Sequence, residues 1–206
     1  MANQMVAKYK DQNCTVVALS DGGVMVGAQI ALRLKCVLTM LLTAPLSLPN
    51  EVDDIGVVSE RGEITYSDMY STGDLEELQS EFRNYIEQER IKSIHEINSL
   101  LGRGGLIRPD LLKGHNVILV SDGLNSGLSL EAAANFLKPV DFKKLIGAVP
   151  IASVKAVDRM HVLADEIYCL SVIADYINTN HYYDADDIPD HKAVLKTVRE
   201  IVLHWK

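Results

Sequence analysis

Two stretches of the sequence share one pattern, in which an apolar run rich in β-branched residues leads through a glycine-bearing turn into apolar residues at helical spacing. The first spans residues 14–34, with its turn at Asp21-Gly22-Gly23, and the second spans residues 116–137, with its turn at residues 121–127. A continuous apolar run is typical of a strand that is buried on both faces, and glycine permits a tight turn. The repeated unit therefore predicts strands of a parallel sheet, each followed by a covering helix.

The rest of the chain continues the alternation of strands and helices. The expected strands are residues 14–20, 37–42, 116–120, 145–151 and 166–170, and the expected helices are residues 24–34, 74–101, 128–137, 154–163 and 191–205. Residues 43–70 are expected to form a loop and short strands, with a hairpin turn at Glu60-Arg61-Gly62. Alternating elements without repeats or a linker predict one α/β domain over residues 1–206, with a five-stranded, mostly parallel sheet and helices on both faces.

Composition excludes several classes of partner. The net charge of -8 argues against a nucleic-acid surface, which needs a basic face. The longest apolar run, residues 36–49, contains Pro45 and Pro49 and is too short to span a bilayer. The three cysteines are far apart and show no metal-binding spacing, which is typical of buried thiols in a reducing compartment. We therefore expect a cytoplasmic protein that binds neither nucleic acid nor membranes.

The second turn carries the strongest functional signal. Asn125, Ser126 and Ser129 supply side-chain donors, and Gly127 lets the backbone approach a ligand closely. The start of a helix adds unpaired N–H groups and partial positive charge, so the turn is suited to bind a phosphate. The same residues also suit a plain strand-to-helix connection, which needs a glycine and a helix cap as well.

This turn lies within a longer match. Residues 117–130 read Val-Ile-Leu-Val-Ser-Asp-Gly-Leu-Asn-Ser-Gly-Leu-Ser-Leu and resemble the phosphoribosyl pyrophosphate signature of type I phosphoribosyltransferases, in particular a bacterial and archaeal branch. Residues 16–24 resemble the pyrophosphate loop of that family, and the resemblance extends over about residues 14–200. It implies the type I phosphoribosyltransferase fold, with a parallel-rich sheet, helices on both faces and a small hood at about residues 43–70.

The resemblance also implies a ligand and the residues that bind it. The ligand would be ribose 5-phosphate, a nucleoside monophosphate or phosphoribosyl pyrophosphate, with Mg²⁺ as cofactor if the chain is catalytic and with a role in nucleotide metabolism. Asp122 would be the catalytic residue that holds the ribose. The ligand-binding residues would be Ser121, Asp122, Gly123, Leu124, Asn125, Ser126, Gly127, Leu128 and Ser129, together with Asp21, Gly22 and Gly23. A homodimer is common in this family.

Two departures from the family pattern weaken the expected activity. Ser121 replaces the first of two adjacent acids, and losing one hydrogen bond to a charged group costs roughly 1.5–3 kcal/mol. Asp21 stands where a basic residue usually faces the pyrophosphate, although it could instead hold Mg²⁺. We therefore expect transfer from phosphoribosyl pyrophosphate to be weakened. The alternative is a nucleotide-binding regulatory or structural partner without catalysis.

Two weaker signals have simpler interpretations. Gly102-Arg103-Gly104-Gly105 could be a displaced phosphate loop, but its place before a strand favours a connector. The acids Asp184, Asp186, Asp187 and Asp190 lack the glycine and the terminal glutamate of a calcium loop, which favours a solvated turn.

Overall fold

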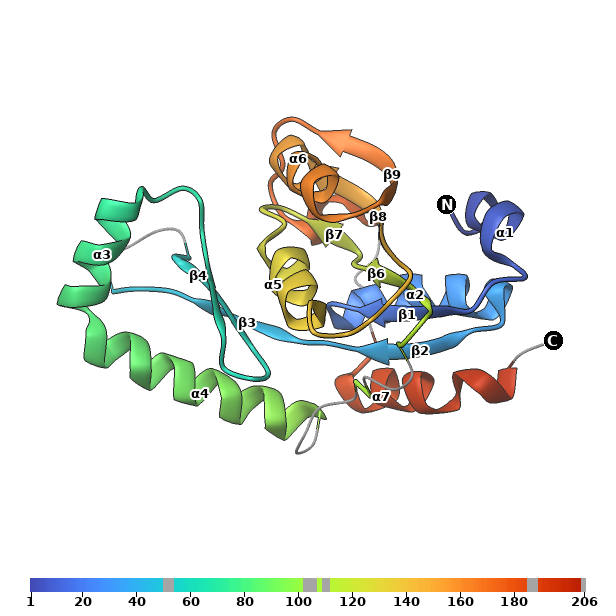
Figure 1. Ribbon diagram of the computed structural model, residues 1–206, viewed down its shortest axis with the longest axis horizontal. Coiled ribbons are helices and arrows are strands. Elements are labelled where there is room, and N and C mark those ends of the chain that lie inside the picture. Colours follow the sequence, from blue (N-terminus) through green and yellow to red (C-terminus); the bar gives the residue numbers. More distant parts are fainter. Residues whose placement is uncertain (50–53, 102–106, 109–111, 185–188, 205–206) are drawn as a thin grey trace.

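The computed structural model describes residues 1–49, 54–101, 107–108, 112–184 and 189–204. The larger of its two sheets has six parallel strands in the order β2-β1-β6-β8-β7, with β9 also paired to β8 (Figure 1). The strands are β1 (Cys14–Ala18), β2 (Val37–Met40), β6 (Asn116–Val120), β7 (Gly123–Leu124), β8 (Lys144–Ser153) and β9 (Glu166–Ile173). Five of these correspond to the expected strands, and β7 is a two-residue addition, so the parallel α/β architecture is confirmed.

Helices cover both faces of this sheet. They are α1 (Ala2–Tyr9), α2 (Asp21–Leu34), α5 (Leu128–Leu137), α6 (Val154–Leu163) and α7 (His191–Glu200), with short 3-10 turns at Thr179–Tyr182 and Ile201–His204. Alternate residues of β1 and β6 point to opposite faces, so Val16 and Ile118 pack in the core beneath α2 and α7, whereas Val17 and Leu119 pack beneath α5 and α6. Both strands are buried along their whole length, which explains why they lack polar side chains at alternate positions.

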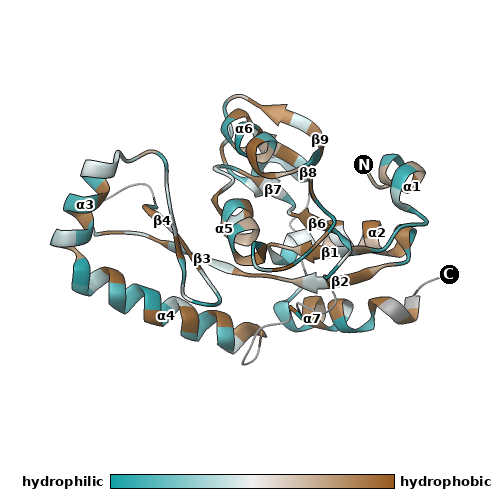
Figure 2. Ribbon diagram, viewed as in Figure 1, coloured by the Kyte–Doolittle hydropathy of each residue, from teal (hydrophilic) through white to brown (hydrophobic). Residues whose placement is uncertain are grey.

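A second, smaller sheet follows β2 in the chain. Its strands β3 (Thr43–Leu46), β4 (Gly56–Ser59) and β5 (Ile64–Tyr66) are antiparallel, and they are followed by α3 (Thr72–Glu81) and α4 (Arg83–Leu101). These elements lie to one side of the central sheet in Figure 1 and share their own apolar cluster, which includes Leu46, Val58 and Ile86. Figure 2 shows that α3 and α4 carry both hydrophilic and hydrophobic residues, and the hydrophobic Leu78 and Ile86 pack in this cluster. We refer to residues 43–101 as the small lobe.

The small lobe contacts the rest of the protein through α5 and through the end of α4, which packs in the core beneath α2 and α7. Val57 of β4 packs with Leu128 and Ala132 of α5, and the Arg61 guanidinium lies 4.0 Å from the centre of the Phe136 ring. Pro45 lies in β3, which is an edge strand, where the missing N–H disturbs no ladder. The region for which the sequence predicts a hood thus contains the small sheet.

Several predicted boundaries were wrong. Helix α2 begins at Asp21 rather than at residue 24, because Ser20 caps it by accepting a hydrogen bond from Gly23 N at 2.9 Å. Gly22 and Gly23 therefore form the first helical turn and not a tight turn before it. The long helix predicted at residues 74–101 is two helices that are separated at Phe82, whose φ is -101°.

Other differences lie at the ends of the chain and of its elements. The polar start of the chain forms α1, which the sequence pattern did not predict, because only Met5 and Tyr9 of this helix are buried. The helix expected at residues 191–205 ends at Glu200 and continues as a 3-10 turn. Residues 102–105, and Asp186 and Asp187 of the acidic cluster, lie outside the described residues. Within the described ranges, no helix has the length and apolar character needed to cross a membrane.

Candidate functional site

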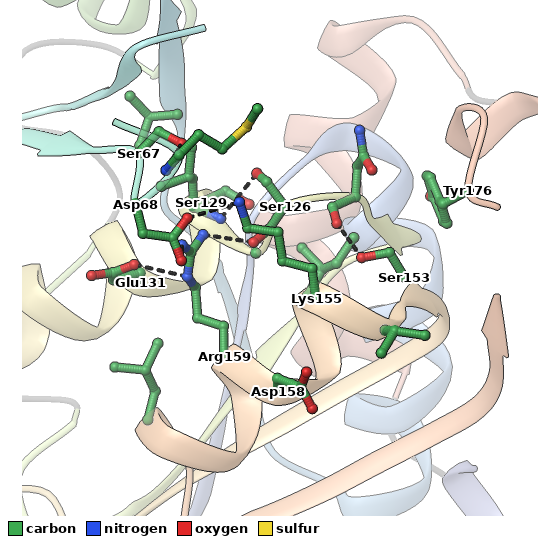
Figure 3. A pocket seen from close by; sticks show the side chains of 18 of the residues that line it. Ser67, Asp68, Ser126, Ser129, Glu131, Ser153, Lys155, Asp158, Arg159 and Tyr176 are labelled. Atoms are coloured by element: carbon green, nitrogen blue, oxygen red, sulfur yellow. Dashed lines mark hydrogen bonds and ion pairs between the residues drawn. The ribbon is translucent and has the colours of Figure 1, made fainter. Parts of the chain in front are cut away.

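A cavity of about 1150 Å³ opens at the carboxyl end of the central sheet, between the turn that precedes α5, the start of α6 and the small lobe. The turn contributes Gly123 through Ser129 to its lining, α6 contributes Lys155 and Arg159, and the small lobe contributes Asp68. Figure 3 shows these side chains converging on one space. Crevices at the carboxyl ends of parallel strands are where ligands of open α/β sheets bind.

The turn presents unpaired backbone donors. Gly127 has a φ of 75°, a left-handed conformation that glycine adopts without strain, and it caps α5 without a side-chain hydrogen bond. Among the described residues, the amides of Ser126, Gly127 and Ser129 have no hydrogen-bond acceptor. The helix α5 that starts here adds partial positive charge at the same point. The turn thus keeps its N–H groups available instead of closing on itself.

The carbonyl groups of the same turn are held by residues of α6 and its cap. The hydroxyl of Ser153, which caps α6, donates a hydrogen bond to the carbonyl oxygen of Asn125. Nη1 of Arg159 donates to the carbonyl oxygen of Ser126 at 2.6 Å. With two successive carbonyls held in this way, the orientation of the turn is fixed before any ligand arrives.

Arg159 and Lys155 bring two cations to this side of the cavity, and neither was predicted as a site residue from the sequence. Arg159 pairs with Glu131 of α5 at 3.0 Å and with Asp68 at 2.8 Å, and Lys155 pairs with the other oxygen of Asp68 at 2.8 Å. The two cations are four residues apart on α6, and this spacing after a predicted strand was the signal that could have found them. Their ion pairs lower the pKa of the Asp68 carboxyl below its usual value, mainly through the hydrogen bond from Lys155.

Asp122 and Ser121 lie beside the cavity but do not line it. Oδ1 of Asp122 accepts a hydrogen bond from Ser20 Oγ at 2.6 Å, and Ser121 Oγ donates to the carbonyl oxygen of Gly123 at 2.9 Å. A Cβ atom at Gly22 would overlap the Asp122 carboxylate, so the two turns meet closely at this point. Asp122 therefore rests against the first turn of α2.

Asp21 is also engaged within the protein. Its carboxylate lies 2.8 Å from Nδ1 of His191, at the start of α7, and Nε2 of His191 lies 3.3 Å from the carbonyl oxygen of Leu100. Gly23 donates its amide to Ser20 rather than to the cavity. Of the predicted site residues, Gly123 through Ser129 are thus gathered on the cavity, whereas Ser121, Asp122, Asp21, Gly22 and Gly23 form a neighbouring cluster outside its lining.

Tyrosine side chains close the site on the side of the C-terminal segment. Tyr183 Oη donates to the carbonyl oxygen of Asp122 at 2.7 Å, and Tyr176, which lines the cavity, lies directly over Gly123. Burial raises the pKa of both phenols above the usual value of 10.0, which favours their protonated form still further. As for metals, the described part of the chain contains no group of three or more His, Cys, Asp or Glu side chains that could hold an ion.

Comparison with known proteins places this geometry in context. A family model named phosphoribosyl transferase domain matches residues 1–188. Curated proteins from two strains of Mycobacterium tuberculosis, each named "Putative phosphoribosyl transferase", are 25% identical over 181 residues, which is 87% of this chain and 40% of theirs. The chain thus spans less than half the length of these relatives.

Solved structures show the same fold. A crystal structure from Thermus thermophilus aligns with a TM-score of 0.66 and 26% identity, covering 99% of this chain and 95% of that one. A hypoxanthine phosphoribosyltransferase from Staphylococcus aureus aligns with a TM-score of 0.50 and 12% identity, covering 84% of this chain and 69% of that one.

Proposed function

The chain belongs to the phosphoribosyl transferase domain family, and from this premise we propose that it binds the 5-phosphate of a phosphoribosyl ligand at residues 125–129. One observation carries the proposal, namely that the turn keeps the amides of Ser126, Gly127 and Ser129 free at an open cavity. Backbone N–H groups at a helix start bind phosphate without a basic side chain, so the acidic net charge of the chain does not oppose this.

We propose ribose 5-phosphate or a nucleoside monophosphate as the ligand, bound in preference to phosphoribosyl pyrophosphate. Transfer requires that the departing pyrophosphate be neutralised, and the side chains at residues 21–23, in the first turn of α2, offer no positive charge for this. Asp21 is an anion paired with His191, and Gly23 N is already bonded to Ser20. Mg²⁺ would have to enter together with the pyrophosphate, because Asp122 and Asp21 are each engaged by other side chains.

A second candidate function is transfer itself, as in the transferases to which the family owes its name. The observation that favours it is Asp122, which keeps one of the two acids of the family signature next to the turn. Release of its carboxylate from Ser20 on ligand binding would let it reach the ribose hydroxyls. In either case we place the protein in the cytoplasm, where its three free cysteines would stay reduced.

Titration calorimetry with three ligands tests the proposal: ribose 5-phosphate, a nucleoside monophosphate, and phosphoribosyl pyrophosphate with Mg²⁺. We expect the two monophosphates to bind and the pyrophosphate donor to bind no more tightly. Ser129→Asp places a carboxylate at the turn and should abolish binding by charge repulsion. Asn84→Asp adds the same charge in the exposed first turn of α4 and should leave binding unchanged.

Two outcomes would count against the proposal. Clearly tighter binding of phosphoribosyl pyrophosphate would favour the transferase over the monophosphate-binding protein. Equal binding of the monophosphates to wild type and Ser129→Asp would show that the phosphate lies elsewhere, and the turn would then be a plain strand-to-helix connection.

A further inference from the structure

One carboxylate of the small lobe lies against two cations of α6, beside the turn at residues 125–129, which we call the phosphate turn. Asp68 belongs to the segment between β5 and α3, and its two oxygens lie 2.8 Å from Lys155 Nζ and 2.8 Å from Arg159 Nη2. Figure 3 shows the carboxylate of Asp68 facing the ends of the Lys155 and Arg159 side chains. An anion therefore already occupies the cationic part of the cavity, and it belongs to the protein itself.

The three side chains differ in how firmly they are held. Arg159 is only 8% exposed and is fixed by Glu131 and by the carbonyl oxygen of Ser126 in addition to Asp68. Lys155 is 41% exposed and pairs with Asp68 alone among the described residues, and Asp68 is 62% exposed and pairs with Lys155 and Arg159. Ion pairs between exposed side chains contribute little to stability because water and salt screen them. Asp68 is thus the part of the network that can leave.

We propose that Lys155 and Arg159 form an anion subsite beside the turn, and that Asp68 is its internal occupant until a phosphate monoester displaces it. The inference rests on the proposed function, because the turn at residues 125–129 supplies the amides that bind the rest of the phosphate. The inference adds Lys155 and Arg159 as two cations that bind the phosphate, and Asp68 as a carboxylate that competes with it.

The larger negative charge of a phosphate favours it over the Asp68 carboxylate at this subsite. A phosphate monoester carries a charge of about -1.5 to -2 at pH 7 and three acceptor oxygens, against a single charge and two oxygens for a carboxylate. It can contact the turn amides and Lys155 together, whereas Asp68 contacts only the two cations. Other acids line the cavity at Asp54, Glu131 and Asp158, so an anion is favoured only at the edge formed by the turn and these cations.

Displacement of Asp68 has a consequence for the small lobe. Asp68 lies three residues before Ser71, which caps α3, and two residues after Tyr66, the last residue of β5. The contact with α6 therefore ties the connection between β5 and α3 to the central sheet. A phosphate that takes the place of Asp68 releases this connection, which couples binding at the turn to the motion of the small lobe.

Calorimetry with ribose 5-phosphate tests the inference with three variants and a matched control. Asp68→Asn removes the competing charge and should raise affinity about threefold to tenfold. Lys155→Met should lower affinity, and in the double variant the gain from Asp68→Asn should be much smaller, because its main partner is gone. Glu87→Gln removes a carboxylate that is also exposed and paired with an arginine, on α4, and should change nothing.

Hydrogen exchange supplies a second measurement on the same proteins. Saturating ribose 5-phosphate should speed exchange of the amides of residues 67–71 in wild type. Asp68→Asn should show this faster exchange already without ligand, and Glu87→Gln should not.

The outcomes separate this inference from the proposed function. If ribose 5-phosphate binds wild type and Asp68→Asn with equal affinity and leaves amide exchange unchanged, the inference is overturned. The proposal that residues 125–129 bind phosphate would not be affected. Ribose 5-phosphate that binds neither protein would overturn both. The inference would also be overturned if Asp68→Asn raised the affinity for ribose 5-phosphate as much in the Lys155→Met background as in wild type. The gain in affinity would then not come from this subsite.

Discussion

Ser20 Oγ donates a hydrogen bond to Oδ1 of Asp122 across 2.6 Å and at the same time accepts one from Gly23 N. One hydroxyl thus caps α2 and fixes the carboxylate of Asp122. Ser20 joins the two strand-to-helix turns, which are about a hundred residues apart in the chain, at the carboxyl end of neighbouring strands β1 and β6.

Ser20→Ala should therefore destabilise the protein and loosen Asp122. Loss of the cap and of one hydrogen bond should lower the free energy of unfolding by about 1–2 kcal/mol, measured by urea denaturation. Ser20→Asn can still accept from the amide of Gly23 and should recover most of the loss. Equal stabilities of wild type and the alanine variant would mean that the cap contributes nothing.

Gly22 should not tolerate even one added methyl group. A Cβ atom there would overlap the carboxylate of Asp122, and relieving such an overlap typically costs about 1–3 kcal/mol. Gly73→Ala is the matched control, because Gly73 also lies in the first turn of a helix and its nearest neighbour would be Ser71 Oγ at 3.9 Å. Thermal unfolding should show a lower Tm for Gly22→Ala and an equal or higher Tm for Gly73→Ala. The reverse order would place Asp122 away from Gly22.

The charge of Asp21 should lower the affinity for phosphoribosyl pyrophosphate but not the affinity for ribose 5-phosphate. Asp21→Asn removes the negative charge at the expected pyrophosphate end and should raise affinity for phosphoribosyl pyrophosphate with Mg²⁺ several-fold. Ribose 5-phosphate lacks that group, so its affinity should not change. Calorimetry of both ligands against both proteins gives the comparison. A weaker pyrophosphate complex would instead support the idea that Asp21 holds Mg²⁺.

The elements that sequence predicted well are those whose pattern is local. The β-branched runs of β1 and β6 are buried on both faces, so their composition alone indicates parallel strands. The position of the turn before α5 was predicted as well, because glycine, hydroxyls and a helix start stand within five residues, whereas phosphate binding at this turn stays a prediction. The start of α2 was missed although its signal is present, because Ser20 was counted with the strand rather than as a helix cap.

The spacing of Lys155 and Arg159 on a predicted helix is visible in the sequence, but their place beside the cavity could not be predicted, because it depends on how distant segments meet. Asp68 follows a short strand of the small lobe, and Arg159 lies on α6, ninety-one residues later in the sequence. Nothing in either local pattern states that the two segments meet. The contact between Asp21 and His191 could not be predicted for the same reason, because it requires α7 to pack next to the start of α2.

Glu60, in the turn between β4 and β5, should make stability depend on pH. Its Oε2 is buried without a hydrogen-bond partner among the described residues, and burial raises the pKa of this carboxyl from 4.5 to about 7. An acid with a raised pKa in the folded state binds its proton more tightly there than in the unfolded chain. Stability from this group is therefore full below pH 4.5 and is lost as the pH rises to about 7.

Glu60→Gln removes the ionisation but keeps the shape, so the variant should become more stable than wild type as the pH rises from 5 to 8. We expect a gain of about 1–2 kcal/mol at pH 8, less than the full burial cost because the side chain keeps part of its contact with water. Glu63→Gln, at an exposed position of the same hairpin, should follow wild type throughout. Urea denaturation at a series of pH values measures all three. Parallel curves for wild type and Glu60→Gln would mean that water or a conformational change solvates the carboxylate, and the hairpin would then not be packed as tightly against α5 as the contact between Arg61 and Phe136 indicates.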